Sequence, residues 1–260
     1  MNRISIITIC FNNLEELKQT CESVEKQQEL PYEHIIIDGS TNSNINNWLT
    51  GSPQPPIRKW IFESDKGIAD AFNKGISIAN GEIIVLLNSG DMFFDSEVLS
   101  KVSKRFLIDA DLMWLHGKYK IKRGGEWVII GKIFEAKKLY RGMRSLCHQT
   151  MFVKKELYSK FGVYNKDLKI AMDYDFVIRI RNEKFSFINT PLVSFAPDGT
   201  SSINYYRSLE EARLVYFKYF GRSVKLQLWQ LRLKILHYVL HSPIGNSLYF
   251  IKRKLNLANW

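Results

Sequence analysis

Short apolar runs alternate with helix-periodic segments along the first half of the chain. The runs at 4–9, 33–38 and 83–87 are rich in Ile and Val and lack polar alternation, as is typical of strands buried on both faces of a sheet. Apolar residues between 14 and 24 recur at three- and four-residue spacing, which predicts an amphipathic helix. This order of strand, helix and strand predicts an α/β fold, doubly wound, with a mainly parallel sheet between helices.

The same patterns continue through the rest of the chain. Alternating charged and apolar residues around Gly124-Gly125 predict a hairpin across 112–130. The polar segment 199–202 is a predicted loop. The remaining expected elements are strands at 59–63 and 185–193, and helices at 68–79, 95–106, 155–161, 172–180 and 224–240.

Acidic residues close two of the predicted strands. Asp38 ends the second strand, and Asp91 follows the strand at 83–87 through the turn Asn88-Ser89-Gly90. Ligands of open α/β sheets bind beyond the carboxyl ends of the strands. A carboxylate there can hold a hard divalent cation that keeps other sites free for phosphate. Taken alone, the turn at Asp91 is equally compatible with an ordinary solvated strand end.

Charge is concentrated at the end of the chain. The formal net charge is +11, of which residues 205–260 carry +8 and the preceding residues only +3. A basic end on a nearly neutral body indicates an anionic surface, either lipid headgroups or nucleic acid. We therefore predict a catalytic domain over 1–204 and a basic amphipathic helical extension over 205–260.

Other bulk properties narrow the class of protein. A hydrophobic content of 45% is ample for a packed core. The three cysteines form no CxxC pair, which fits a reducing cytoplasm. There is no apolar run of the length of a membrane-spanning helix or of a secretory signal.

Four segments, in order, resemble family 2 of the inverting nucleotide-sugar glycosyltransferases. The resemblance is to the bacterial branch that builds O-antigen, capsule and other surface polysaccharides, and it covers roughly residues 2–195. The segments are ISIITICFNN, HIIIDGSTNSN, ESDKGIADAFNKGISIANGEIIVLLNSGD and CHQTMFVKKELYSKFGVYNKDLKIAMDYDFVIRI. The third is long and distinctive. The resemblance implies the GT-A fold.

The resemblance also implies roles for individual residues. Asp173 matches the general base, with Asp175 as its neighbour. Asp91 matches the last acid of the metal-binding DxD motif, which would contact Mn²⁺ or Mg²⁺ on the diphosphate. Contacts to the nucleotide sugar are expected from Thr8, Asn12, Asp38, Asp65, Gly67, Asp70, Asn88, Ser89 and His148.

One position departs from the family pattern. Ser89 stands where the DxD motif has its first acid, so Asp91 is the one carboxylate left to the metal. Water, diphosphate oxygens or His148 would complete an octahedron around the ion.

Structural roles compete with these functional ones. Asp173 could cap the start of its helix, where the dipole favours an acid. Asp38 could bond its own turn, and Asp70 could form an exposed helix ion pair with Lys74. His148 could be packed near the start of a strand.

Together these observations predict an inverting, metal-dependent hexosyltransferase. It would move glucose, galactose or an N-acetyl form from a UDP-sugar to a lipid-linked (undecaprenyl-diphosphate) saccharide in O-antigen or surface polysaccharide assembly. The alternatives are a catalytically inactive nucleotide-sugar-binding or scaffold protein of the same fold, and a sugar-1-phosphate nucleotidyltransferase. The latter needs a Gly-rich basic loop where this chain has ITICFNN.

The basic end predicts where the enzyme would work. Residues 224–240 place Leu, Trp, Ile and Val between basic residues, as suits the headgroup layer of an anionic membrane. We expect a peripheral protein on the cytoplasmic face of the bacterial inner membrane, and no nucleic-acid partner because no binding motif accompanies the charge. A helix that packs on the catalytic domain, with solvated charges, is the alternative.

Overall fold

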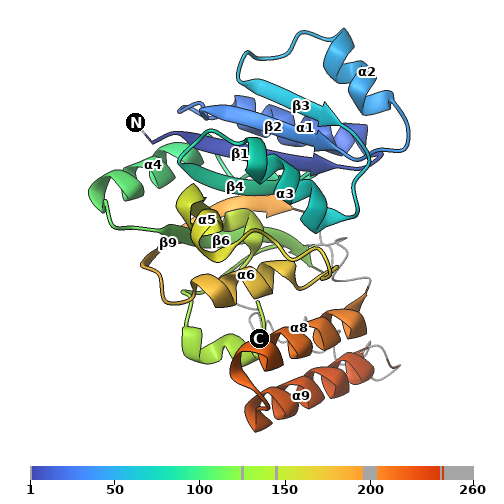
Figure 1. Ribbon diagram of the computed structural model, residues 1–260, viewed down its shortest axis with the longest axis vertical. Coiled ribbons are helices and arrows are strands. Elements are labelled where there is room, and N and C mark those ends of the chain that lie inside the picture. The colour runs from blue at the N-terminus through green and yellow to red at the C-terminus, as the bar shows by residue number, and fades with distance from the viewer. Residues whose placement is uncertain (1, 124–125, 144–145, 196–203, 241, 243–260) are drawn as a thin grey trace.

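The computed structural model describes residues 2–123, 126–143, 146–195, 204–240 and 242. A nine-stranded mixed sheet runs through the middle of the molecule in the order β3-β2-β1-β4-β8-β6-β9-β5, with β7 paired to β6 (Figure 1). The strands are β1 (Ile4–Cys10), β2 (Glu33–Asp38), β3 (Arg58–Phe62), β4 (Ile83–Asn88), β5 (Met92–Phe93), β6 (Trp114–Arg123), β7 (Glu126–Ile130), β8 (Phe152–Lys154) and β9 (Phe185–Phe195).

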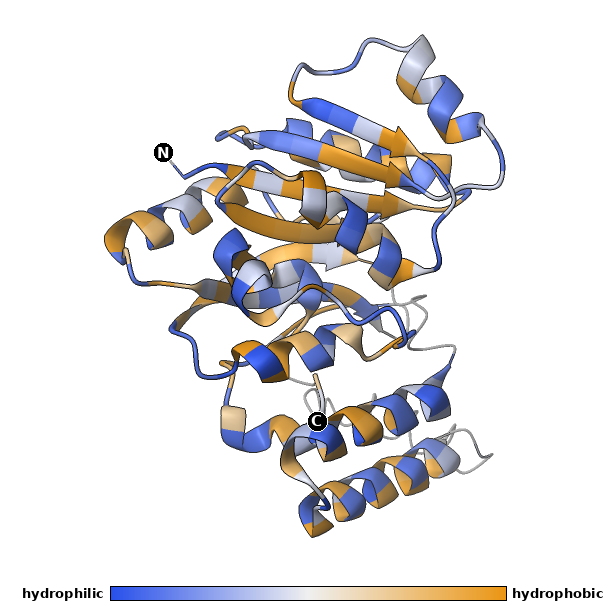
Figure 2. Cartoon of the chain, in the orientation of Figure 1, coloured by the Kyte–Doolittle hydropathy of each residue, from blue (hydrophilic) through white to orange (hydrophobic). Residues whose placement is uncertain are grey.

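Helices cover the sheet on both sides. One apolar core joins α3, α5 and α6 to one face, and two smaller cores join α1, α2 and α4 to the other. In Figure 2 the central strand β4 is hydrophobic along nearly its whole length, in keeping with its burial between these layers. The helices are α1 (Leu14–Glu25), α2 (Asn44–Gly51), α3 (Ile68–Ile78), α4 (Val98–Ile108), α5 (Lys155–Phe161), α6 (Met172–Ile180), α8 (Tyr205–Phe220) and α9 (Val224–Leu240), with 3-10 turns η1 (Ala136–Arg141) and η2 (His148–Thr150).

The half of the sheet formed by the N-terminal residues is parallel, as predicted. Strands β3, β2, β1 and β4 run in one direction, and Ile9 near the end of β1 pairs with both Ile37 and Asn88. This register brings the carboxyl ends of three strands to one edge. Beyond β4 the sheet departs from a purely parallel arrangement, because β8 is antiparallel to both β4 and β6.

Helix α2 was not expected from the sequence. It begins in an asparagine-rich run, and asparagine is a poor helix former. Ile45 and Leu49, one turn apart, are buried in the core that also contains Leu17 of α1 and Ile36 of β2. Tertiary packing therefore stabilises a helix that local propensity does not indicate.

Helices α8 and α9 lie side by side at the end of the molecule opposite α2 (Figure 1). Val215 of α8 is buried in the core that contains α6. Gln230 of α9 donates to the carbonyl of Leu209 at 2.6 Å. The helix expected at 224–240 is confirmed, whereas the division at residue 204 stays a prediction. The loop expected at 199–202 and residues 243–260 of the basic extension lie outside the described residues.

Within the part of the chain that the structure describes, no helix is both long enough and apolar enough to cross a membrane.

Two buried histidines should make the fold sensitive to acid. Burial lowers the pKa of His34 to about 3, helped by the charge of Arg58, and lowers the pKa of His116 to about 4. The unfolded chain therefore binds more protons below its histidine pKa of 6.5, and stability is lost as the pH falls from neutrality.

Between pH 7 and pH 5 each histidine should lower the free energy of unfolding by about 2 kcal/mol. We expect urea unfolding of wild type and His34→Gln to show this as a stability difference that changes with pH. The wild type should lose about 2 kcal/mol relative to the variant over that interval. A pH-independent difference would contradict the assignment.

Candidate active site

The candidate site begins where three loops meet at the carboxyl edge of the parallel strands. The N–H of Gly39, after β2, donates to the carbonyl of Cys10 at the end of β1, with an N···O distance of 3.1 Å. The N–H of Ser89, after β4, donates to Ile9 at 2.9 Å. These bonds extend the strand pairing by one residue and hold the loops together, so the polar residues that follow each strand are neighbours.

Asn12 ties the first loop to the second. Its φ of 56° lies in the left-handed region that asparagine tolerates. Its backbone N–H donates to Ser40 Oγ at 2.8 Å, and its Oδ1 accepts from Thr41 N at 3.1 Å and Asn42 Nδ2 at 2.8 Å. The side chain of Asn12 is exposed at this edge, where its bonds shape the rim of the site.

Asp38 ends β2 with a fully buried side chain. Its Oδ1 accepts from the N–H of Ser40 at 3.0 Å, which is the turn interaction considered as the alternative role. Its Oδ2 is buried and has no hydrogen-bond partner among the described residues. A buried carboxylate oxygen without a partner is costly, and an N–H group of a ligand would satisfy it.

Asp65 lies directly over the loop that follows β2. A Cβ at position 39 would stand only 1.9 Å from Asp65 Oδ2, so any residue other than glycine at Gly39 would displace the side chain of Asp65. Asp65 Oδ1 accepts from the N–H of Gly67 at 2.7 Å, and Gly67 has a φ of 113° that favours glycine. Asp65 and Gly67 thus form a tight turn against the site.

Asp70 is engaged in structural contacts at the start of α3. Its Oδ2 accepts from the N–H of Lys66 at 3.0 Å, and its Oδ1 pairs with Lys166 at 3.2 Å. The bond from Lys66, followed by the pair with Lys166, holds the pKa of Asp70 below its usual value. The pair expected with Lys74 is long, at 4.0 Å.

Thr8 is placed away from the site edge. Its side chain is fully buried within the sheet, and its hydroxyl bonds His34 Nε2 of β2 at 3.0 Å. The structure therefore does not bring the side chain of Thr8 to the edge where Asn12 and Asp38 meet.

Asp91 closes the turn after β4 and is 5% exposed. Its Oδ2 accepts from the N–H of Asn88 at 2.7 Å. The turn needs a positive φ of 95° at Gly90, a backbone conformation that favours glycine. Ser89 accepts a hydrogen bond from the amide of Asn13 in the first loop. Burial raises the pKa of Asp91 to about 6, although the nearby His148 opposes the rise.

His148 connects Asp91 to Asp173. Its Nε2 lies 3.4 Å from Asn88 Nδ2 in the Asp91 turn, and its Nδ1 lies 3.7 Å from Asp173 Oδ2 at the start of α6. Its ring packs edge-on against Phe72, with ring centroids 5.8 Å apart. The fold thus gathers one imidazole and two carboxylates from three segments that are far apart in the chain.

The donor set suits a hard cation only in part. The described residues contain no cluster of three or more His, Cys, Asp and Glu side chains that could hold a metal. Asp91 and His148 nevertheless offer one oxygen and one nitrogen ligand of kinds that Mn²⁺ accepts. Such a pair could bind a cation whose remaining ligands are diphosphate oxygens and water.

Two residues near the site were missed by sequence reasoning. Gln149, 7% exposed, directs its side-chain amide to the carboxylate of Asp91. Its position next to His148 was the available signal. Glu211 of α8 contacts the segment before α6, and no local pattern indicates this because the partners are forty residues apart.

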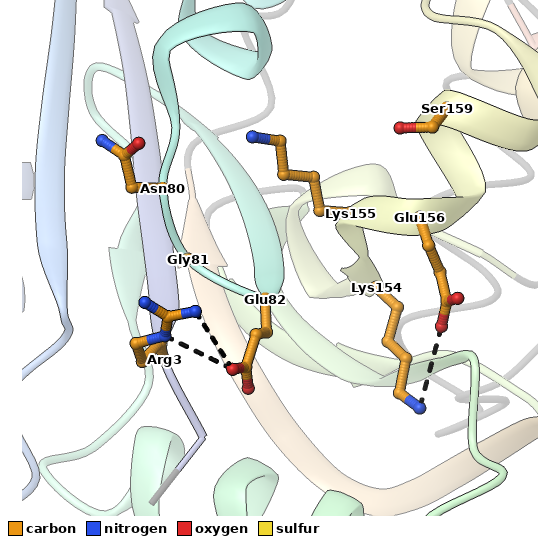
Figure 3. Close-up of a pocket in the computed structure, with 8 residues that line it drawn as sticks. All are labelled: Arg3, Asn80, Gly81, Glu82, Lys154, Lys155, Glu156 and Ser159. Atoms are coloured by element: carbon orange, nitrogen blue, oxygen red, sulfur yellow. Dashed lines mark hydrogen bonds and ion pairs between the residues drawn. The ribbon is translucent and has the colours of Figure 1, made fainter.

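A hollow drawn in Figure 3 lies at the opposite edge of the sheet, beside the residues that precede β1 and β4. Arg3 pairs there with Glu82 at 3.3 Å. The hollow is separate from the acids described above. It is lined by Arg3, Asn80, Gly81, Glu82, Lys154, Lys155, Glu156 and Ser159.

Comparisons with known proteins show which protein family the chain belongs to. Residues 5–162 match the family model of glycosyl transferase family 2. The chain is 33% identical over 178 residues to an uncharacterized glycosyltransferase of Mycobacterium tuberculosis, a match that covers 68% of each protein. It is 26% identical over 183 residues to a PGL/p-HBAD biosynthesis glycosyltransferase of Mycobacterium bovis, covering 67% of this chain and 68% of the relative. The chain belongs to glycosyl transferase family 2, and is thus a transferase.

Solved structures confirm the GT-A fold. Residues 1–349 of TarS from S. aureus share 16% identity with a TM-score of 0.59, and the match covers 83% of this chain but 65% of that one. The mannosyltransferase PcManGT from Pyrobaculum calidifontis, in complex with GDP-Man and Mn²⁺, shares 16% identity with a TM-score of 0.58, over 99% of this chain and 81% of that one.

Proposed function

We propose that this protein is an inverting glycosyltransferase that moves a hexose from a UDP-sugar to a lipid-linked saccharide. The observation that carries the proposal is the gathering of Asp91, His148 and Asp173 beyond the carboxyl ends of β1 and β4. Family membership supports the reaction class. The donor, the acceptor and the role of each residue are our inferences.

Asp173 is the proposed general base. Its side chain is 23% exposed, so part of it is open to an acceptor. The hydroxyl loses its proton to Asp173 as its oxygen forms the bond to the anomeric carbon, while the bond to the diphosphate oxygen breaks. Attack opposite the leaving group inverts the anomeric carbon, so an α-linked donor gives a β-glycoside.

Asp91 and His148 are the proposed residues for the diphosphate side of the donor. They would hold Mn²⁺ or Mg²⁺, which when bound supplies positive charge that stabilises the leaving diphosphate. The Mn²⁺ and GDP-Man complex of the Pyrobaculum mannosyltransferase supports this choice of ion. Because the turn after β4 supplies one carboxylate, with Ser89 in place of a second, we expect weaker metal binding than a turn with two acids would have.

UDP is the proposed nucleotide. Structures of S. aureus TarS contain UDP-GlcNAc and UDP, which supports a uridine donor for this chain of the same fold. The unpartnered Oδ2 of Asp38 could accept an N–H of the base. Glucose, galactose or an N-acetyl form is the proposed sugar, and an undecaprenyl-diphosphate saccharide of O-antigen or surface polysaccharide assembly is the proposed acceptor.

The outer face of α9 supports a membrane-bound acceptor. Its buried side contains Leu226, Gln230 and Leu233, and its other side presents a stripe of exposed apolar residues at three- and four-residue spacing. Lys225, Arg232 and Lys234 flank the stripe, and residues 224–240 contain no acid. The stripe comprises Val224, Leu228, Leu231, Ile235 and Tyr238.

We therefore expect α9 to bind an anionic bilayer, with the stripe among the acyl chains and the cations at the headgroups. The double variant Leu228→Ser, Ile235→Ser should bind vesicles containing anionic lipid at least about tenfold more weakly than wild type, because each apolar side chain contributes about 1.5–3 kcal/mol on burial. Vesicle co-sedimentation at low and high salt measures this.

The matched control is Leu107→Ser, Ile108→Ser, which removes two exposed apolar residues from α4. It should leave vesicle binding unchanged. Absence of wild-type binding would contradict the membrane assignment, and concentration-dependent self-association abolished by the α9 variant would identify a second copy as the occupant instead.

Transfer assays test the proposed reaction. A panel of UDP-, GDP- and dTDP-sugars would be offered with a synthetic lipid-diphosphate sugar, in Mn²⁺ and in EDTA. We expect transfer from one UDP-sugar, lost in EDTA. Transfer that persists in EDTA would contradict the metal role, and nucleotide binding without transfer or donor hydrolysis would favour the inactive scaffold alternative.

A further inference from the structure

Helix α8 contacts the backbone that precedes α6, the helix that carries Asp173. Glu211 reaches from the middle of α8 to this segment, and its side chain is 11% exposed. Its Oε2 accepts from three consecutive N–H groups, at 3.1 Å from Lys169, 2.8 Å from Ile170 and 3.1 Å from Ala171. One carboxylate oxygen thus fixes three residues of the chain.

The remaining oxygen of Glu211 is also satisfied. Its Oε1 accepts from Arg207 Nε at 3.0 Å, one turn earlier in α8. Burial by itself raises the pKa of Glu211, but the N–H groups of Ala171 and Ile170, together with Arg207, outweigh it and hold the pKa below its usual value. The carboxylate is therefore ionised at neutral pH, and a negative charge at the start of a helix is favourable.

The segment that Glu211 holds leads directly into the proposed base. Ala171 is the residue before α6, and its carbonyl accepts from the N–H of Asp175 at 3.0 Å in the first turn of the helix. Asp173 lies two residues after Ala171. The position of its carboxylate, 3.7 Å from His148 Nδ1, depends on where this first turn stands relative to the sheet.

A second contact from α8 holds the same turn. Asp175 is 2% exposed and accepts from the hydroxyl of Tyr219 at 2.9 Å, while Lys218 lies 3.6 Å away. Arg179, one turn further along α6, completes its partners at 2.9 Å. Asp175 is buried against α8, whereas the side chain of Asp173 is 23% exposed, so the two acids of this turn have different environments.

We propose that Glu211 is a positioning residue for the reaction, acting through Asp173. This inference rests on the proposed role of Asp173 as general base. Loss of the three hydrogen bonds would let the first turn of α6 shift, and a displacement of a reacting group by about 1 Å can cost up to about a hundredfold in rate. Residues of α8, outside the stretch that matches the family model, would thus complete the active site.

The test compares Glu211→Ala with Glu210→Gln, whose residue is exposed and pairs with Arg213 on the outside of the same helix. We expect Glu211→Ala to lower kcat of transfer by about tenfold or more while the Kd for UDP changes less than about twofold, because Glu211 bonds the segment before Asp173 and, among the described residues, makes no hydrogen bond to the loops after β1, β2 and β4. Glu210→Gln should leave both values unchanged.

A double variant that combines Glu211→Ala with Asp173→Asn tells whether Glu211 positions Asp173 or only stabilises the fold. If Glu211 acts through Asp173, adding Glu211→Ala to Asp173→Asn should lower kcat by less than about twofold. An equal fold-loss in both backgrounds, or an unchanged kcat in Glu211→Ala, overturns the inference. Should the alanine variant fail to fold, Glu211→Leu, which likewise accepts no hydrogen bond, gives the same comparison.

Failure of the proposed function has a different signature. Full activity of Asp173→Asn would overturn the general base and this inference with it. Loss of activity in Asp173→Asn without any loss in Glu211→Ala or Glu211→Leu would overturn only the role of Glu211.

Discussion

Replacing Asp173 by asparagine should lower kcat of sugar transfer by a factor of about 10²–10⁴, the usual contribution of a general base. Asparagine has nearly the same shape but cannot accept the proton of the acceptor hydroxyl at neutral pH. Its carbonyl oxygen can still accept from the N–H of Tyr174, which lies 2.7 Å from Asp173 Oδ1. We therefore expect the helix and the Kd for UDP to be preserved while transfer is lost.

Steady-state kinetics with a saturating donor measures this effect. Asp167→Asn is the matched control, because Asp167 is exposed in the loop before α6. It should retain wild-type kcat. An Asp173→Asn enzyme with kcat within a few-fold of wild type would show that this carboxylate serves mainly as a helix-start residue.

Replacing Asp91 by asparagine should reduce kcat/KM by a factor of about 10²–10³, because the negative charge that would hold a cation at the diphosphate is removed. The loss should be accompanied by loss of the response to Mn²⁺. Asp111→Asn, at a site whose side chain is 90% exposed, is the control and should behave as wild type. Full activity of Asp91→Asn would exclude Asp91 as an essential metal contact.

The same substitution should stabilise the metal-free fold at neutral pH. Burial raises the pKa of Asp91 from 3.8 to about 6. A raised carboxyl pKa contributes stability at low pH that is lost as the pH rises through the folded-state value. Between pH 4.5 and 7.5, the wild type should lose about 2 kcal/mol of unfolding free energy relative to Asp91→Asn in EDTA.

Denaturant unfolding of both proteins in EDTA measures the difference at the two pH values. Addition of Mn²⁺ at pH 7.5 should raise the unfolding midpoint of the wild type and leave that of Asp91→Asn unchanged. If the variant is less stable than wild type at pH 7.5, the hydrogen bonds of the ionised Asp91 stabilise the fold by more than burial of its charge destabilises it.

The contacts of Asp91 fit a carboxylate whose charge is fully balanced only when a cation binds. The N–H of Asn88 and the side chain of Gln149 partly stabilise the charge of Asp91, and no lysine or arginine pairs with it among the described residues. Asp70, by contrast, already pairs with Lys166 and caps its turn. Asp91 is therefore the better candidate for a cation ligand, whereas Asp70 stabilises the loop before α3.

Periodic burial determined most of the fold from sequence. The strands β1, β2 and β4 and the helices α3 and α5 were predicted within one or two residues, because their apolar residues recur at the spacing of each element. Helix α2 was missed because burial of Ile45 and Leu49 outweighs the poor propensity of its asparagines. The antiparallel β8 could not be predicted, since strand order depends on distant segments.

The residues of the candidate site also fall into those that the sequence indicates and those that only the tertiary structure brings together. By itself, the sequence determined the fold family and identified Asp38, Asp91 and Asp173, because strand ends and a long motif are local patterns. Only the tertiary structure decided that His148 stands between the last two acids, and that Glu211 secures the start of α6. These contacts join residues 25–60 positions apart, and side-chain proximity over such separations follows from packing rather than from any local spacing.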